Sequence, residues 1–449
     1  MTMDRKEFQR LAASRVLLLD GAAGSNFLLA GMPADACTEQ WLIQHPDVLI
    51  RLQREYVDAG TQILYAPTFG GNKTMLQEKH VNLSVQEINS RIVALSREAA
   101  QGSALIAGDM TMTGKQLMPN GTFSIHEAVA VYKEQAKALY EAGVDLFVVE
   151  TMISLQEMRA AVLAIRDVCD LPIMCTFTVD ANGFTFLGTE IAAAAVTLER
   201  MGVDAIGMNC SMGPDQMELA VKKIREAVQI PVIAKANAGH PEQENGRTVY
   251  KMSAEIYAKH AEKLLDAGVG LIGGCCGTTP AFIREICALL KQRGQYVPLG
   301  EVGIVEKTAS MEANHRYQGC LTSTRSVFDT EEAAEISYAG CVAKNYELRS
   351  CLEEKEYDGL MDVLEDAEDS DLLFVDIDMA GVDVIPAIEP LMGVISGMDI
   401  PVCVRTEKEE ILREVLLCYC GSLSVCRTPL IMREDIRNML SRYGAVLAD

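Results

Sequence analysis

The sequence predicts an α/β protein whose larger part is a (β/α)8 barrel, the TIM barrel. From the N-terminus to about residue 290, short apolar runs alternate with longer amphipathic segments, which is typical of parallel strands joined by helices. Glycines such as Gly143, Gly202 and Gly268 precede several of these runs, where they can end a helix before the next strand. Eight runs occur within this stretch, and eight βα units complete a barrel.

The expected strands also predict where chemistry takes place. Active sites of this fold lie on the face formed by the C-terminal ends of the strands, so residues that directly follow the strands should converge there. In chain order the expected strands are 16–20, 62–66, 104–108, 145–150, 173–178, 205–209, 232–236 and 269–274.

A second, smaller α/β domain is expected after the barrel. Residues 301–449 hold 30 acidic and 13 basic residues, a balance of −17 within a total of −23, and this shift suggests a boundary near residue 300. We therefore divide the chain into a barrel at 1–295, a linker at 296–325 and an acidic domain at 326–449. Further βα-like units follow the linker, in about half the chain length that a barrel needs. The expected strands are 372–377, 401–405 and 422–426, and the expected helices are 331–348, 355–368, 407–419 and 433–442.

Composition excludes several classes of function. The net charge of −23 argues against nucleic-acid and anionic-membrane partners, because phosphate binding needs clustered Lys and Arg. The polar N-terminus and the lack of a long apolar run predict a cytoplasmic protein, and the 14 cysteines are too sparse for a disulfide scaffold. The six histidines lack metal-ligand spacing, and no serine-hydrolase elbow, Walker loop or dinucleotide fingerprint occurs.

Three cysteines are the strongest functional signal. Cys275 and Cys276 are adjacent at the end of the eighth expected strand, and Cys210 directly follows the sixth. A glycine-rich strand end can turn both adjacent thiolates toward one metal ion, and Cys210 supplies a third sulfur. Three thiolates would bind zinc and leave its fourth position open for a substrate. Two alternatives are that the cysteines are small buried apolar residues, or that the adjacent pair is redox-active.

A zinc ion with three thiolates favours a thiol substrate. Coordination lowers the pKa of a thiol below its free value of about 8.5 and keeps it as a nucleophilic thiolate. An amino-acid thiol would also need a partner for its ammonium group, and Asp20 and Glu150 are the acids that the barrel places beside the metal. Alternatively, Asp20 caps a following helix and Glu150 is structural.

Weaker substrate-binding candidates follow other strands. The turn that begins at Gly21 can direct backbone N–H groups at a carboxylate. Thr68, Asn209 and Asn237 either contact the substrate or satisfy backbone groups at strand ends.

At these positions the sequence resembles the zinc-dependent homocysteine S-methyltransferases, including the homocysteine module of cobalamin-dependent methionine synthase. The resemblance covers about residues 1–295. It implies that Cys210, Cys275 and Cys276 bind zinc, that Asp20 and Glu150 hold the ammonium of homocysteine, and that a methyl group passes to the zinc-bound thiolate to give methionine. The matching segments are Asp20-Gly21-Ala22-Ala23-Gly24, Thr68-Phe69-Gly70-Gly71-Asn72, Glu150-Thr151-Met152, Asn209-Cys210-Ser211, Ala236-Asn237-Ala238-Gly239 and Gly273-Gly274-Cys275-Cys276-Gly277.

The acidic region resembles the first half of the pterin-binding barrel that follows this module in methionine synthase. Asp378 and Arg405 replace the asparagine and the acid that are usual there, so we do not expect folate to bind. The chain lacks the cobalamin-binding Asp-x-His-x-x-Gly pattern, so a methylcorrinoid donor would arrive on a separate protein. S-methylmethionine or betaine are small-molecule alternatives. A different class of function is a docking component of a corrinoid methyl-transfer complex with little activity of its own.

Overall fold

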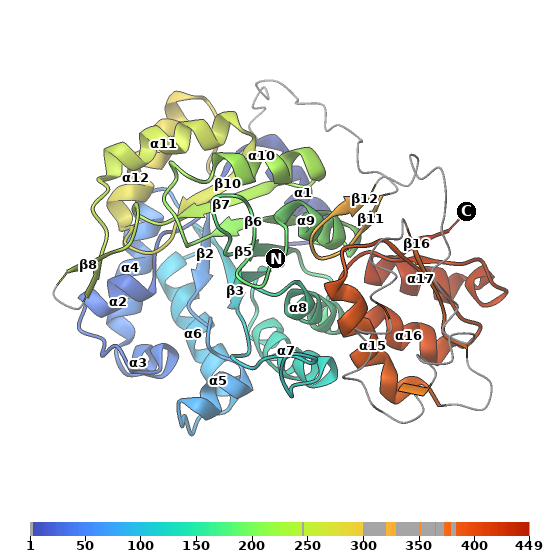
Figure 1. The fold of residues 1–449 in the computed structure, drawn as a ribbon. Coiled ribbons are helices and arrows are strands. Elements are labelled where there is room, and N and C mark those ends of the chain that lie inside the picture. Colours follow the sequence, from blue (N-terminus) through green and yellow to red (C-terminus); the bar gives the residue numbers. More distant parts are fainter. Residues whose placement is uncertain are drawn as a thin grey trace.

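The structure is a computed structural model, and Figure 1 shows a barrel with a second α/β unit beside it. It describes residues 3–244, 247–299, 320–328, 350–351, 364, 372–378 and 383–448. Most of the expected linker lies outside these residues. The helix expected at 331–348 also lies outside them, as does the helix expected at 355–368 except for residue 364.

The barrel consists of eight parallel strands, as the sequence predicts. Their order around the sheet is β1-β10-β7-β6-β5-β4-β3-β2, and the parallel bridge between Leu19 and Ile63 joins the two ends. Each of the eight expected runs overlaps one strand, and β3 and β4 extend two residues beyond their expected ends. The strands are β1 (Leu17–Leu18), β2 (Ile63–Ala66), β3 (Leu105–Met110), β4 (Leu146–Met152), β5 (Ile173–Phe177), β6 (Ala205–Asn209), β7 (Val232–Ala236) and β10 (Val269–Gly274).

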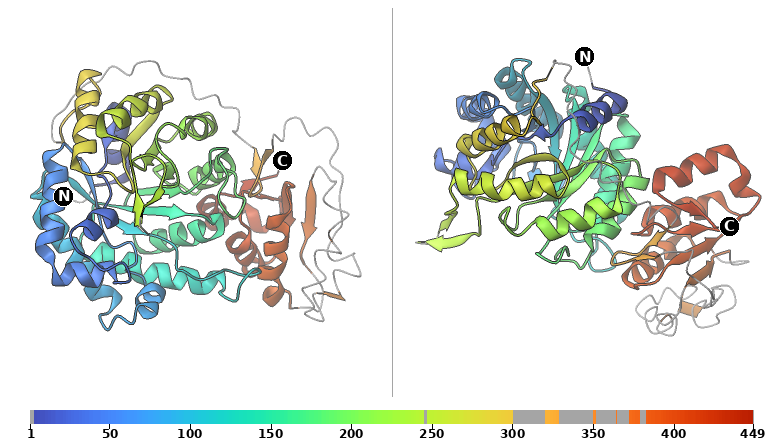
Figure 2. Two further views of the ribbon diagram at one scale, coloured as in Figure 1. Left: turned by 60° about the vertical axis from the view of Figure 1, so that its left-hand side comes forward. Right: turned by 90° about the horizontal axis from the view of Figure 1, so that it is seen from above.

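Helices surround the strands (Figures 1 and 2). Ser84 and Ser124 begin two of the longest with complete capping boxes, which satisfy N–H groups that the first turn leaves free. The barrel helices are α1 (Arg5–Ser14), α2 (Gly24–Leu29), α3 (Thr38–Gln44), α4 (Pro46–Asp58), α5 (Lys73–Glu78), α6 (Val85–Ala100), α7 (Ile125–Glu141), α8 (Leu155–Val168), α9 (Ile191–Arg200), α10 (Glu218–Ala227), α11 (Ala254–Asp266) and α12 (Pro280–Gln292). A hairpin that the sequence did not predict, β8 (Glu242–Glu244) with β9 (Arg247–Val249), follows β7.

Two apolar layers hold the barrel together. Side chains from alternate strand positions, among them Leu17, Ile63 and Val148, fill its interior, and Phe8 of α1 packs against them. A larger cluster lies between the strands and the surrounding helices. Because apolar side chains fill the barrel, the polar residues that follow the C-terminal strand ends share a space outside this packed interior.

In its described residues, the second unit contains four parallel strands in the order β13-β14-β15-β16, half the number in the barrel. Three of its strands lie where they were expected, whereas α15 and β16 were not predicted. The elements are β13 (Leu373–Asp376), α15 (Ile385–Gly397), β14 (Val402–Arg405), α16 (Glu409–Cys418), β15 (Ser424–Val425), a short 3-10 helix (Leu430–Met432), α17 (Glu434–Tyr443) and β16 (Val446–Leu447), preceded by the hairpin β11 (Leu321–Thr322) and β12 (Val327–Phe328). The likeness to a pterin-binding barrel stays a prediction.

The two units share a packed interface. Arg159 of α8 is almost fully buried, and its guanidinium donates to the carbonyl oxygens of Leu416 (2.7 Å), Leu417 (3.2 Å) and Tyr419 at the end of α16. These carbonyls lack helical partners because the helix ends there. One apolar cluster also runs from the barrel helices into the second unit. In the described part of the chain, no helix has the length and apolar character needed to cross a bilayer.

Candidate metal and substrate site

A cavity of about 370 Å³ lies at the C-terminal ends of the barrel strands. Its wall includes Asp20 after β1, Asp109 of β3 and Glu150 of β4, while Cys210, Cys275 and Cys276 lie at another part of the wall. Residues distant in the sequence therefore meet where the barrel prediction placed them.

The three cysteine sulfurs form a compact triangle. All three Sγ atoms lie within 4.8 Å of one another, and those of Cys210 and Cys276 are 3.8 Å apart. Sulfurs that share a tetrahedral zinc at about 2.3 Å are separated by about 3.8 Å, whereas a disulfide bond needs about 2.0 Å. The triangle fits a shared metal ion. Every cysteine among the described residues is a free thiol.

The backbone around these thiols adopts conformations that are uncommon for residues other than glycine. Cys210 and Ser211 have φ values of 63° and 56°, both in the left-handed region. Gly277 follows Cys276 with a φ of 79°, and a Cβ there would lie 2.4 Å from the ring of Tyr250. The side chain of Tyr250 lies close to Cys276, and burial together with the nearby Cys276 raises the pKa of the Tyr250 hydroxyl. Such conformations persist where surrounding contacts enforce them, and they are concentrated at functional sites.

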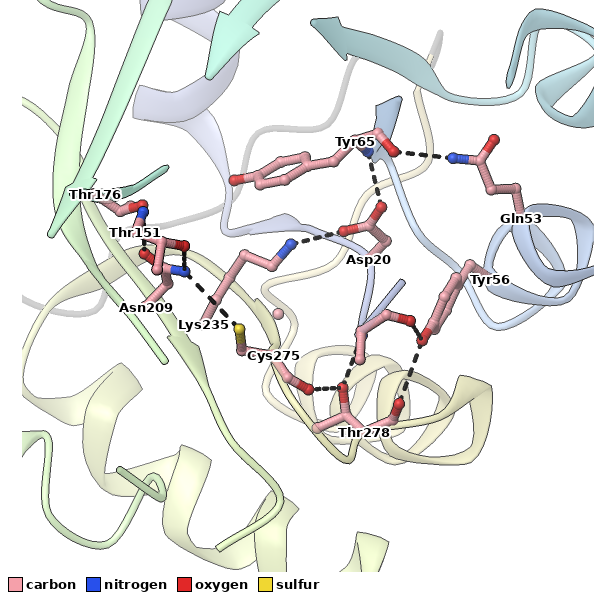
Figure 3. Close-up of polar contacts among 12 residues, drawn as sticks. Asp20, Gln53, Tyr56, Tyr65, Thr151, Thr176, Asn209, Lys235, Cys275 and Thr278 are labelled. Carbon is pink, nitrogen blue, oxygen red and sulfur yellow. Dashed lines mark hydrogen bonds and ion pairs between the residues drawn. The ribbon is translucent and has the colours of Figure 1, made fainter. Parts of the chain in front are cut away.

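Asn209 links three neighbouring strand ends behind the thiols (Figure 3). Its Oδ1 accepts from the Thr151 N–H (2.9 Å) and from the Thr176 hydroxyl (2.8 Å), and its Nδ2 donates to the Thr151 hydroxyl (2.7 Å). The same Nδ2 lies 3.8 Å from Sγ of Cys275. Asn209 is fully buried, so it is placed to orient the sulfur site from behind the cavity wall.

Asp20 uses both carboxylate oxygens within the protein (Figure 3). Its Oδ1 accepts from Lys235 Nζ (2.8 Å) and its Oδ2 from the Tyr65 N–H (2.8 Å). Lys235 Nζ also lies 3.6 Å from the centre of the Tyr65 ring. Burial disfavours charge on Lys235, but Asp20 and Glu150 outweigh it and raise its pKa, so the ammonium stays charged. Asp20 does not cap a helix, since α2 begins after Ala23.

Two other acids of the cavity have oxygens without partners among the described residues. They are Asp109 Oδ1 and Glu150 Oε2, and the hydroxyl of Tyr65 is likewise buried and unpartnered. Burial raises the pKa of Asp109 well above its usual range, and the nearby charge of Glu150 raises it further. Buried oxygens of this kind require a donor.

The structure brings some predicted substrate residues to the cavity and places others behind it. Asp20, Gly21 and Glu150 line the cavity. Thr68, Asn209 and Asn237 are almost completely buried outside that lining, where Thr68 donates to the Asp109 carbonyl (2.7 Å). The positions of Thr68, Asn209 and Asn237 therefore do not support direct contact with a substrate.

Sequence reasoning missed several residues of the site. Lys235 could have been noticed, because a lysine inside the apolar run of β7 needs a buried partner. Asp109 could also have been recognised from the sequence, because it directly follows an expected strand, much as Asp20 ends one. Tyr65 and Tyr250 could not have been recognised from the sequence, because Tyr65 lies within an apolar strand and Tyr250 lies in a loop.

Comparison with known proteins agrees with this fold. Residues 17–290 match the homocysteine S-methyltransferase family, and this chain belongs to that family. A methionine synthase of Mycobacterium leprae is 31% identical over 308 residues, which are 64% of this chain and 26% of the relative. The methionine synthase of Mycobacterium tuberculosis is 32% identical over 294 residues, 62% of this chain and 25% of the relative.

A solved structure shows the same fold. The metallated form of the homocysteine methyltransferase MmuM from Escherichia coli matches with a TM-score of 0.54 and 22% identity, over 63% of this chain and 98% of that protein. The match to the mycobacterial methionine synthases, by contrast, spans only about a quarter of their length.

Proposed function

We propose that this protein transfers a methyl group to the thiolate of homocysteine held on zinc by Cys210, Cys275 and Cys276, giving methionine. The observation that most directly supports this proposal is the triangle of three cysteine sulfurs at the wall of a cavity that is also lined by carboxylates. The family to which the chain belongs supports the substrate. In the reaction the sulfur of homocysteine forms a bond to the methyl carbon, and the bond from that carbon to the donor breaks with its electron pair going to the donor.

The donor set fits zinc. Hydrogen bonding with Cys210 and burial raise the pKa of the Cys275 thiol, so a cation is needed to hold the three sulfurs as thiolates. Zinc accepts thiolate ligands in tetrahedral sites, and three protein ligands leave one position for a substrate. When bound, zinc would lower the pKa of the homocysteine thiol and keep it ionised at neutral pH.

The protein's own residues would orient the substrate and the metal ligands. Asn209 and Tyr250 contact Cys275 and Cys276 from outside the triangle, and second contacts of this kind hold ligands in position. The loop that begins at Gly21 lines the cavity and is proposed to face the substrate carboxylate. A Cβ on Gly21 would lie 2.6 Å from the Tyr56 hydroxyl, so a larger residue would displace this loop.

The methyl donor is proposed to be either a methylcorrinoid carried by a separate protein or a small methyl-onium compound. The methionine synthases that the chain matches are much longer than the matched region, which spans only about a quarter of each. We also propose the domain division at 1–295, 296–325 and 326–449, which the separate parallel sheets of the two units support.

The test is a donor screen on the zinc-loaded full chain. Methylated corrinoid protein, methyltetrahydrofolate, S-methylmethionine and betaine would each be supplied with homocysteine, and methionine would be measured together with zinc content. We expect about one zinc per chain and methionine formation with one donor. Stoichiometric zinc and homocysteine binding without methionine from any donor would instead favour the docking component of a corrinoid complex.

A further inference from the structure

Two cysteines of the second unit lie side by side, outside the site described above. The Sγ atoms of Cys403 and Cys426 are 3.2 Å apart, so that one thiol hydrogen-bonds the other, and both are free thiols. A disulfide bond needs a separation of about 2.0 Å, so the two sulfurs would have to approach by only about 1.2 Å to form one. The family match ends at residue 290 and assigns no role to this pair.

The register of the sheet brings the two thiols together. β14 and β15 are neighbouring parallel strands, and Cys403 is the partner of Ser424. Cys426 lies two residues beyond Ser424, so its side chain points from the same face of the sheet as that of Cys403. The N–H of Cys426 also donates to the Val404 carbonyl (2.9 Å), which holds the chain beyond β15 against β14. Backbone hydrogen bonds therefore keep the thiols in contact.

The pair differs from the three cysteines of the metal site. Among the described residues, no histidine, carboxylate or further cysteine completes a metal-binding group of three with Cys403 and Cys426. Zinc sites in proteins use three or four protein ligands, so two thiols without a third ligand fit sulfur exchange better than zinc binding. Cys426 is partly exposed, whereas Cys403 is buried. A small oxidant can therefore reach Cys426 first.

We propose that Cys403 and Cys426 form a reversible modification site that reacts with small disulfide compounds. The thiolate of Cys426 attacks one sulfur of the small disulfide, whose S–S bond breaks and releases one thiol. Cys403 then attacks the sulfur of Cys426, and the second small thiol leaves. The protein gives up two protons and two electrons, and the small disulfide takes them up as it becomes two thiols. This proposal does not depend on the proposed function.

The new bond would close a loop that contains α16. Carbonyl oxygens at the end of this helix accept from Arg159 of the barrel, so the loop includes the part of the second unit that binds the barrel. A cross-link restricts the unfolded chain and thereby favours the folded one. Oxidised protein should therefore unfold at a higher urea concentration than reduced protein, and a reductant should reverse the change.

Proximity sets the equilibrium of the exchange, whereas the ionisation of the attacking thiol sets its rate. Burial together with the neighbouring Cys403 raises the pKa of the Cys426 thiol to about 12, and Arg405 acts in the opposite direction. Because little thiolate is present near neutral pH, the exchange is slow there. Its products must therefore be measured after they have stopped changing.

The test is a glutathione titration of the zinc-loaded full chain. The protein would be equilibrated with different ratios of oxidised and reduced glutathione, its free thiols alkylated, and the cross-linked peptides measured by mass spectrometry. For thiols held in contact, the effective concentration should exceed by about 100-fold the millimolar value of groups joined by a short flexible chain. A millimolar value, or a mixed disulfide of Cys426 with glutathione in place of the cross-link, would overturn the proposal.

Two variants show which thiols take part. Cys403→Ser leaves Cys426 without its partner, so the reaction should stop at the mixed disulfide with glutathione. Cys169→Ser is the control, because Cys169 is a partly exposed thiol of the barrel whose loss should leave the cross-link unchanged. Loss of the cross-link in Cys169→Ser would show that the pairing is wrong. Thermal unfolding reports whether each variant has folded.

The urea measurement tests the geometry independently of the variants. A higher unfolding midpoint in the oxidised native protein, reversed by a reductant, supports a bond that the folded second unit accommodates. A lower midpoint in the oxidised protein would mean that the bond distorts the fold, and the proposal would then be wrong.

Discussion

Charged side chains at the strand ends of the barrel and of the second unit differ in whether they have hydrogen-bond partners. In the barrel, Asp109 and Glu150 keep buried oxygens without a partner among the described residues. In the second unit, Arg405 bonds Asp376 (3.0 Å) and Glu407 (2.8 Å), and Asp378 accepts from the Thr406 hydroxyl (2.6 Å). Both units are parallel α/β structures, so fold class alone does not make a binding site. The barrel differs in that carboxylate oxygens at its strand ends are buried without a hydrogen-bond partner among the described residues. This difference can be tested.

The largest effect is expected at the cysteines. Cys275→Ser and Cys276→Ser should each lose stoichiometric zinc, and methyl transfer should fall by more than about 100-fold, because replacing even a residue behind a ligand can cost that much. Zinc would be measured by atomic absorption alongside methionine formation. Cys37→Ser is the control, since Cys37 also lines the cavity but lies outside the triangle. A Cys276→Ser protein that retains zinc and activity would remove Cys276 from the metal site.

A large loss of stability is expected where the two units meet. Arg159→Met leaves the carbonyls at the end of α16 without their donor, and we expect the free energy of unfolding to fall by about 3 kcal/mol. Urea unfolding measures the change. The control is Arg442→Met, which removes a partly exposed ion pair with Asp167 and should cost no more than about 1 kcal/mol. Equal losses in the two variants would show that burial of Arg159 adds nothing.

The unpartnered acids predict a pH dependence of substrate preference. Burial and the charge of Glu150 raise the pKa of Asp109, so at low pH this acid is neutral and attracts an ammonium weakly. As the pH rises and Asp109 ionises, binding of homocysteine should strengthen relative to 4-mercaptobutanoate and then level off. Both ligands bind through a thiol that ionises, so this effect cancels in the ratio of their dissociation constants. The ratio therefore reports the contribution of the ammonium group, which 4-mercaptobutanoate lacks. A ratio that stays constant with pH in the native protein would contradict the prediction.

The smallest effect is expected in the second unit. Among the described residues, the ion pairs that Arg405→Gln breaks are those with Asp376 and Glu407 near the surface, so zinc content and homocysteine affinity should stay at their native values. Calorimetric titration with homocysteine checks this. A weaker affinity in this variant would mean that the strand ends of the second unit contribute to the site, and the contrast between the two units would no longer hold.

The predictable part of the site follows from strand positions. Cys210, Cys275 and Cys276 were found because the expected strands placed them at one end of the barrel, and the structure brings their sulfurs together. The contacts of Asp20 could not be predicted, because Lys235 lies 215 residues away and its partner depends on the final strand order. The region 372–448 was predicted less completely, since α15 and β16 were missed.

By itself, the sequence determined the eight strands of the barrel and the end of the barrel at which its chemistry lies. Alternating apolar runs and helix-ending glycines are local signals, and parallel strands bring their C-terminal ends together whatever the details of packing. Only the tertiary structure decided which acids are free, because a carboxylate's partners come from distant strands and from the side chains that exclude water around it. Asp20 and Asp109 look alike along the chain, but Lys235 donates a hydrogen bond to Asp20, whereas Asp109 Oδ1 has no partner among the described residues.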